Sequence, residues 1–166
     1  MTYIWKDMSE ADLLPHASPS EHFHHFSDGQ QRRLLMVDEE VAYPDGRMIV
    51  SRTDLNGIIT HANQAFIDMS AYTRDELIGA PQCILRHPDV PSDIFAEMWQ
   101  TISEGKTWFG YVKNLRKDGR YYWVYASVNP NFRDGKIVAY TSVRRKPSRA
   151  KINDVIALIG KMKEVA

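Results

Sequence analysis

The sequence predicts an α+β domain with an antiparallel sheet, because strand-like and helix-like segments fall into separate blocks along the chain. Two strand-like segments come first, several short helical segments follow, and three longer strand-like segments complete the pattern. Asp-Gly and Asn-Gly pairs, which favour tight hairpin turns, separate the strand-like segments. These pairs begin at Asp45, Asn56, Asp118 and Asp134.

Five segments have the β-branched and aromatic composition of strands. They are MIVSRTD (48–54), IITHA (58–62), WFGYVKNLR (108–116), RYYWVYASVNP (120–130) and KIVAYTSVRR (136–145). In the fourth, the odd-numbered residues from Tyr121 to Ser127 share one face, and the even-numbered residues from Tyr122 to Val128 share the other. Both faces carry bulky side chains, so we expect both to be covered at least in part.

Three helical segments are predicted between the second and third strands. They are NQAFIDMSAY (63–72), TRDELIGA (73–80) and SDIFAEMWQTISEG (92–105). In the second, Thr73 is the expected N-cap, with Glu76 three residues later and Gly79 after the end. In the third, Ser92 is the expected cap and Gly105 the expected stop.

The remaining sequence divides into an N-terminal extension (1–44) and a C-terminal helix (147–166) around a central domain (45–146). The extension lacks steady periodicity. We expect a short helix near residues 4–14, whereas residues 28–43 fit a helix and a strand equally well.

The C-terminal segment predicts an amphipathic helix. Its apolar residues recur at alternating spacings of three and four, which is typical of a coiled-coil seam. They are Ile152, Val155, Ile159 and Met162. Because the seam spans only about two heptads, two readings stay open. The helix either packs on its own sheet or faces a second copy or a partner.

Composition excludes several classes of protein. The 166 residues include 21 basic and 21 acidic side chains, so the chain lacks the basic field that drives nucleic-acid binding. The single cysteine, Cys83, rules out an intramolecular disulfide and a cysteine-based zinc site. The first residues lack the pattern of a signal peptide, and the apolar runs are far shorter than the ~20 residues of a spanning helix. We expect a soluble cytoplasmic protein without membrane insertion.

Residues 48–148 resemble a PAS domain. The segment TDLNGIITHANQAFIDMSAYTRDELIG (53–79) is similar to the PAS opening, with Ala71 where the family usually has Gly. Three later segments resemble the FAD-binding PAS domain of bacterial aerotaxis receptors and their stand-alone soluble relatives. They are LRHPDVP (85–91), MWQTISEGKTWFGYVKNLRKDGRYYWV (98–124) and NPNFRDGKIVAYTSVRRKPS (129–148).

The resemblance implies a five-stranded antiparallel sheet with short helices on one face, and a pocket for FAD in residues 45–146. It also implies which residues support the cofactor. The candidates are Arg86, His87, Asp89, Trp108, Asn114 and Asn63. A guanidinium suits a phosphate or a flavin carbonyl, an indole suits an aromatic wall, and an amide suits the pyrimidine edge of the ring. Asp89 is also expected to hold Arg86 or His87, to cap the following helix, or to bond an adenine or ribose group.

Alternatives stay open beside FAD. They are FMN, a haem held through His87, and a cofactor-free PAS module used for dimerisation. Cys83 lies outside the motif with which LOV domains form a flavin adduct, and we expect it to be buried and inert. The histidines of HFHH (22–25) are expected to be solvated or to face a partner, and RRKPSR (144–149) is expected to be a surface patch.

The function that the resemblance implies is redox or oxygen sensing of the energy-taxis type. No arrangement of nucleophile and base appears, so we expect no enzymatic turnover. We expect a homodimer that signals to a separate chemoreceptor-like protein.

Overall fold

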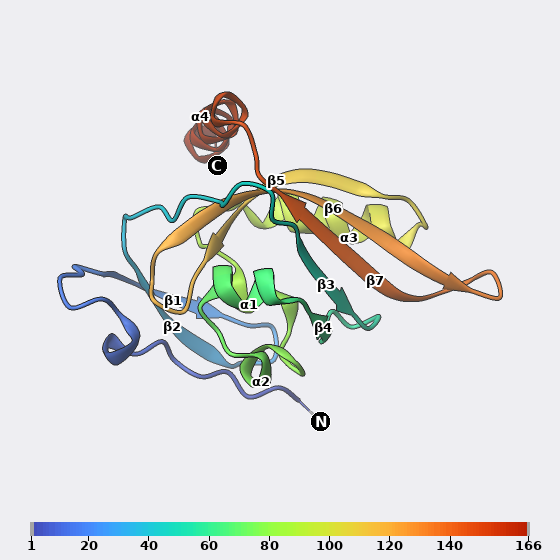
Figure 1. Cartoon of the computed structure of the whole chain (residues 1–166), viewed down its shortest axis with the longest axis horizontal. Coiled ribbons are helices and arrows are strands. Elements are labelled where there is room, and N and C mark those ends of the chain that lie inside the picture. Colours follow the sequence, from blue (N-terminus) through green and yellow to red (C-terminus); the bar gives the residue numbers. More distant parts are fainter. Residues whose placement is uncertain (1, 166) are drawn as a thin grey trace.

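The computed structural model describes residues 2–165, and its centre is an antiparallel sheet with strand order β4-β3-β7-β6-β5 (Figure 1). The strands are β3 (Ile49–Thr53), β4 (Ile59–Ala62), β5 (Trp108–Leu115), β6 (Tyr121–Arg133) and β7 (Lys136–Arg145). The predicted α+β class and the five predicted strands are confirmed. Because β3 pairs with β7, the first hairpin and the last strands form one continuous sheet.

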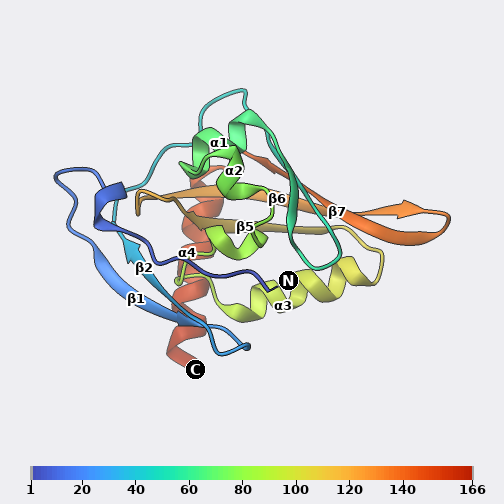
Figure 2. The same cartoon turned by 90° about the horizontal axis from the view of Figure 1, so that it is seen from below.

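Short helices cover one face of this sheet (Figures 1 and 2). They are α1 (Gln64–Ser70), α2 (Arg74–Leu77), the 3-10 helix η2 (Gln82–Leu85) and α3 (Ser92–Ser103). The capping box predicted for α2 is present. The Glu76 backbone N–H donates to Thr73 Oγ1 at 3.2 Å, and the Thr73 N–H donates to Glu76 Oε1 at 3.1 Å.

The start of α3 differs from the prediction. The helix begins at Ser92 with Pro91 as its N-cap, and no side chain caps it. The expectation that Ser92 or Asp89 caps this helix is therefore wrong. The Asp89 carboxylate instead accepts a hydrogen bond from Lys113 Nζ at 2.9 Å, because the turn before α3 directs it toward β5. The first N–H groups of α3 are left without a side-chain partner.

The N-terminal extension forms a hairpin of two antiparallel strands, β1 (Ser20–His25) and β2 (Gln31–Met36). The strand reading of residues 28–43 is thus the right one. The prediction of a helix near residues 4–14 is wrong except for one 3-10 turn, η1 (Glu10–Asp12). The preceding residues run beside β2 instead, where the Met8 N–H donates to the Arg33 carbonyl at 3.0 Å.

Apolar contacts and backbone pairing join this extension to the sheet. Leu34 and Leu35 form a buried cluster with Met8 and with Leu115 of β5. The linker after β2 then pairs with the start of β6. The Val37 N–H donates to the Gly119 carbonyl and the Val41 N–H to the Tyr121 carbonyl, each at 2.7 Å.

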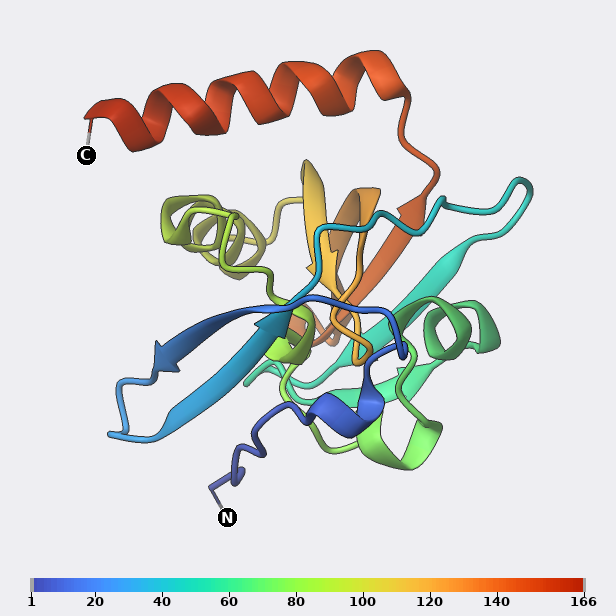
Figure 3. The same cartoon turned by 90° about the vertical axis from the view of Figure 1, so that its left-hand side faces the viewer.

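The C-terminal helix α4 (Arg149–Val165) lies on the face of the sheet opposite the short helices (Figures 1 and 3). Its residues Ile152 and Ile159 are buried against Trp123 of β6, with Val155 beside them. The predicted seam therefore packs on the chain's own sheet, and both faces of β6 are covered as expected. Neither α4 nor any other helix within residues 2–165 has the unbroken apolar length needed to cross a bilayer.

Candidate cofactor site

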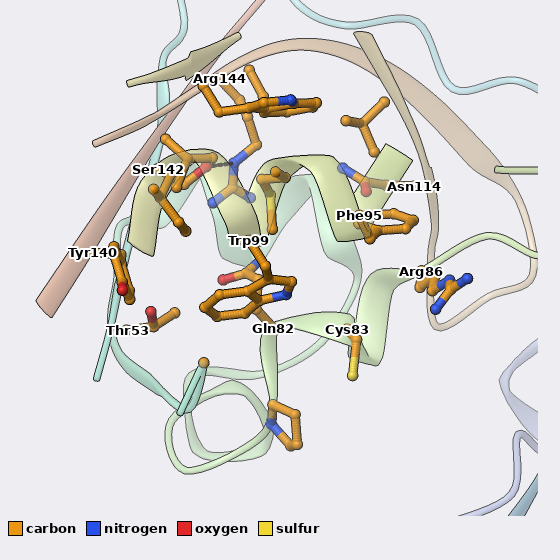
Figure 4. Close-up of a pocket in the computed structure, with 18 of the residues that line it drawn as sticks. Thr53, Gln82, Cys83, Arg86, Phe95, Trp99, Asn114, Tyr140, Ser142 and Arg144 are labelled. Atoms are coloured by element: carbon orange, nitrogen blue, oxygen red, sulfur yellow. Dashed lines mark hydrogen bonds between the residues drawn. The ribbon is translucent and has the colours of Figure 1, made fainter. Parts of the chain in front are cut away.

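A cavity of about 390 Å³ lies between the inner face of the sheet and α3 (Figure 4). Apolar side chains from the two elements form most of its lining. They are Val112, Val124, Ala126 and Val128 from the sheet and Phe95, Met98, Trp99 and Ile102 from α3. The even-numbered residues of β6 face the cavity because side chains alternate along a strand. A volume of this size is typical of a small-molecule site.

Trp108 forms part of the wall along β5 and is 6% exposed. A Cβ atom added to Gly110 would lie 2.2 Å from Cη2 of this indole. The ring therefore occupies the space that any side chain at position 110 would fill. Glycine is the residue that permits this close approach of an aromatic ring to the strand.

A second tryptophan closes the cavity on the side of α3. The Trp99 ring lies edge-on to Tyr140 with centroids 5.7 Å apart. A Cβ atom on Gly57 would lie 3.1 Å from the same indole. Because Trp99 is 38% exposed, it lies between the cavity and the solvent. Two indoles thus border an apolar space, an arrangement suited to a flat aromatic ligand.

Arg144 of β7 is a buried cation at the cavity wall, 3% exposed. Its Nε donates to Ser142 Oγ at 3.1 Å, Nη2 donates to Ser51 Oγ, and the guanidinium lies 4.6 Å from the centre of the Phe66 ring. Its Nη1 is buried without a hydrogen-bond partner. Burial lowers the pKa of Arg144, and no carboxylate within residues 2–165 forms an ion pair with it.

The prediction that residues 144–149 form a surface patch is wrong for Arg144. Tyr140, Ser142 and Arg144 alternate along β7 and all line the cavity, whereas Arg145 is exposed. The two-residue period from Tyr140 could have identified this side chain as inward-facing. Its place in a run of basic residues concealed that signal.

The structure brings three of the predicted cofactor residues to this cavity. Arg86, Trp108 and Asn114 all line it, and Figure 4 shows Arg86 and Asn114. The backbones of Arg86 and Asn114 form an isolated antiparallel bridge, which fixes the turn before α3 against β5. The Arg86 guanidinium lies 4.7 Å from the centre of the Phe95 ring. Gln82 was not predicted; its Oε1 accepts a hydrogen bond from Ser51 Oγ at 3.1 Å.

His87 and Asp89 do not line the cavity. His87 is 4% exposed and its Nδ1 accepts a hydrogen bond from the Asp89 backbone N–H at 3.0 Å. Burial and then the charge of Lys113 lower the pKa of His87 to about 4. None of the lining residues is a histidine, so the geometry does not favour haem ligation from this turn. A supporting role for both residues in cofactor binding stays a prediction.

Asn63 also lies outside the cavity lining, and its side chain is engaged in the fold. Its Oδ1 accepts hydrogen bonds from the backbone N–H groups of Phe66 and Val50, both at 3.1 Å. Its Nδ2 donates to the Met48 carbonyl at 2.9 Å. Asn63 is therefore the N-cap of α1 and joins that helix to β3.

Cys83 is exposed at the edge of the cavity, so the expectation that it is buried is wrong. The 3-10 helix η2 directs Ile84 and Leu85 into the core and leaves Cys83 on the opposite side. A segment of four residues is too short for its helical periodicity to be recognised in the sequence.

The family described as PAS fold matches residues 59–144. Among curated proteins, the chain is 46% identical over 117 residues to the aerotaxis receptor of Escherichia coli. It is 31% identical over 97 residues to the nitrogen fixation regulatory protein of Klebsiella pneumoniae. These matches cover 70% and 58% of this chain but only 23% and 20% of the two relatives, so the chain spans a minor part of their length.

Two solved structures show the same architecture. A PAS domain from Colwellia psychrerythraea is 24% identical with a TM-score of 0.56, over 61% of this chain and 87% of that one. The light-state structure of the blue-light photoreceptor Aureochrome1 LOV is 22% identical with a TM-score of 0.59, over 70% of this chain and 91% of that one. At this level of identity the likeness concerns the fold.

Proposed function

Because the chain belongs to the PAS fold family, we propose that it is a flavin-binding sensor, with FAD as cofactor and cellular redox state or oxygen as its signal. The PAS resemblance drawn from the motifs is confirmed, and relatives such as the aerotaxis receptor are signalling proteins. The identity of the cofactor as FAD and the identity of the signal are our proposal.

The observation that carries the proposal is the buried guanidinium of Arg144, which has no counter-ion among residues 2–165. A buried charge without a counter-ion is costly, so the site is arranged for an electron-rich ligand. Most of the remaining lining is apolar, and Trp108 and Trp99 border the cavity. A flat apolar slot with a few polar groups at one edge suits an isoalloxazine ring better than a sugar or a free phosphate.

Three kinds of side chain form the site. Trp108 and Trp99 form the aromatic borders, which position a planar ring. The amides of Asn114 and Gln82 can each donate and accept hydrogen bonds, as the pyrimidine edge of a flavin requires. When bound, a flavin supplies reversible electron transfer, and reduction increases the negative charge on its ring. The fixed cation of Arg144 stabilises that charge relative to the neutral ring.

Signal output in this proposal passes through the sheet. Val124 lines the cavity, and the adjacent Trp123 contacts α4 on the other face. A change in charge inside the cavity alters the hydrogen bonds of the inner face and thereby the docking of α4. We propose that a separate chemoreceptor-like protein reads this change, that the chain acts in the cytoplasm as a homodimer, and that it performs no turnover chemistry.

A cofactor assay tests the proposal. The purified protein is expected to show the absorption spectrum of a flavin, and chromatography of the released cofactor to identify FAD. Arg86→Ala is expected to lower FAD affinity about tenfold while the protein remains folded. Arg145→Ala, an exposed arginine outside the cavity, is the matched control and is expected to bind normally. A colourless protein that takes up no FAD after refolding with it contradicts the proposal.

A further inference from the structure

A second cavity of about 330 Å³ lies beneath the N-terminal hairpin. Residues of β1, β2, the turn after η2 and the start of α3 line it. Figures 2 and 3 show the hairpin on the same side of the sheet as α3. The N-terminal extension, for which the sequence predicted no role, therefore forms one wall of a site.

The two cavities have a common border. Cys83 and Arg86 line both of them. A ligand that extends from the first cavity into the second would therefore have to pass these two side chains. The guanidinium of Arg86 stands at the point where such a ligand would cross.

The second cavity is cationic and contains no carboxylate in its lining. Its polar side chains are His22 and His24 of β1, Arg32 of β2, Arg86, and Ser92 of α3. The even-numbered residues of β1 and β2 face the cavity, because side chains alternate along a strand. Arg33 lies on the other face of the hairpin, where it pairs with Glu10 and Glu21. Burial and the charge of Arg86 lower the pKa of His24, which agrees with a surplus of positive charge at this place.

Arg32 is the buried member of this group, 6% exposed. It donates to the carbonyls of Lys6 and Ile84 and to the Tyr72 hydroxyl, at 2.9, 3.2 and 3.0 Å. These partners hold the guanidinium in place, but no carboxylate in the described part of the chain forms an ion pair with it. The uncapped N-terminus of α3 adds free N–H groups and a partial positive charge beside it.

Aromatic surface accompanies the positive charge. Phe26 lines the cavity, lies edge-on to His24 with centroids 4.6 Å apart, and stacks on Trp5 at 4.3 Å. Cations and N–H groups suit a pyrophosphate, and an aromatic surface suits a purine base. We propose that the second cavity binds the ADP half of FAD, so that the N-terminal hairpin makes the chain select FAD over riboflavin. This inference rests on the proposed flavin function and assigns the other end of the same ligand.

A pair of neighbouring histidines provides the test. His24→Glu places a carboxylate in the second cavity, whereas His25→Glu makes the same change on the opposite, exposed face of β1. The cofactor-free full-length protein is titrated with FAD and with riboflavin, and binding is followed by quenching of flavin fluorescence. We expect His24→Glu to weaken FAD binding about tenfold and leave riboflavin binding unchanged, and His25→Glu to affect neither.

The outcomes separate this inference from the proposed function. Equal affinity of the wild-type protein for FAD and riboflavin, or equal effects of the two variants on FAD, overturns the role of the hairpin but leaves flavin binding intact. Absence of binding by both flavins overturns the proposed function and this inference together. If His24→Glu does not fold, as judged by circular dichroism, His22→Glu at the exposed rim of the cavity takes its place, with the same expected selectivity.

Discussion

The guanidinium of Arg144 has hydroxyl partners for two of its nitrogens and none for Nη1. A buried ion without a counter-ion destabilises the cofactor-free protein. Replacing it with an apolar side chain of similar length should therefore lower the free energy of unfolding only a little. For Arg144→Met we expect the free energy of unfolding of the cofactor-free protein to fall by no more than about 1 kcal/mol, or to rise. FAD affinity should fall about tenfold.

Urea unfolding and FAD titration measure these two effects, with Arg145→Met as the control. A loss of stability above about 3 kcal/mol together with unchanged FAD affinity would assign Arg144 a purely structural role.

His87 gives the protein a pH dependence with a definite sign. Its pKa is lowered from 6.5 to about 4, first by burial and then by Lys113. Between these pH values, His87 binds a proton in the unfolded chain but not in the folded protein. Its contribution to the free energy of unfolding is therefore fully present above pH 6.5 and is lost as the pH falls toward 4. The shift corresponds to about 3 kcal/mol.

His87→Asn checks this effect, because an amide oxygen near the Nδ1 position can still accept the Asp89 N–H and cannot become charged. The difference in unfolding free energy between wild type and variant should change across this pH window. A difference that stays constant from pH 7 to pH 4 rejects the assignment.

The candidate cofactor site was predictable where it coincides with a local motif, and it was hidden where it depends on tertiary structure. Arg86, Trp108 and Asn114 belong to recognisable segments and meet at the cavity. Arg144 looks like a surface residue in the sequence, because its burial depends on Ser51 and Phe66, which lie far away along the chain. The walls of the second cavity come from four separate segments, and no local sequence pattern predicts such a site.

At the scale of elements, turn chemistry decided what could be predicted. The five sheet strands are bounded by Asp-Gly and Asn-Gly turns or by helices, and the alternation within β6 matches its two buried faces. Strand β1 was missed because its residues, SEHFHH, are polar and mostly exposed, so that period-two alternation is absent. Its pairing with β2, rather than its own composition, makes it a strand.

The end of α1 contains a residue in an unfavourable conformation. Ala71 is the C-cap with φ 64°, in the left-handed region that glycine adopts without strain. We expect Ala71→Gly to raise the free energy of unfolding by about 1 kcal/mol, because the Cβ penalty is removed. Thermal unfolding checks this. A fall in Tm would mean that the added freedom of the unfolded chain outweighs the relieved strain.

Strand β5 places Gly110 under the Trp108 ring, where a Cβ would lie 2.2 Å from Cη2. Gly110→Ala is therefore expected to displace the indole and to lower FAD affinity about tenfold. Gly160→Ala is the control, because nothing lies within 4 Å of a Cβ at that position in α4. The control should stabilise the helix slightly and leave FAD binding unchanged. Unchanged FAD affinity and tryptophan fluorescence in Gly110→Ala would contradict the placement of Trp108.

At the scale of the whole molecule, α4 and the cavity lie on opposite faces of the same sheet. Trp123 contacts α4, Val124 contacts the cavity, and Asp89 lies 2.9 Å from Lys113 and 3.6 Å from Lys163 of α4. If reduction of the cofactor changes the docking of α4, removal of α4 must change the reduction equilibrium by the same free energy. We expect a chain truncated after Ser148 to lose stability, through exposure of Trp123, and to show a shifted midpoint potential.

Spectroelectrochemistry of the full and truncated chains measures this shift, and proteolysis of α4 in the oxidised and reduced states provides the independent check. Equal potentials and equal cleavage rates would show that α4 takes no part in the response.

The backbone pairing of the linker after β2 with Gly119 and Tyr121 joins two segments far apart along the chain. Synthesis runs from the N-terminus, so the β1–β2 hairpin, held by local contacts, can form as soon as it leaves the ribosome. Its apolar residues Leu34 and Leu35 stay incompletely covered until Leu115, a member of the same buried cluster, has been synthesised. The hairpin is thus among the last parts of this domain to reach its final place, although it precedes the sheet along the chain.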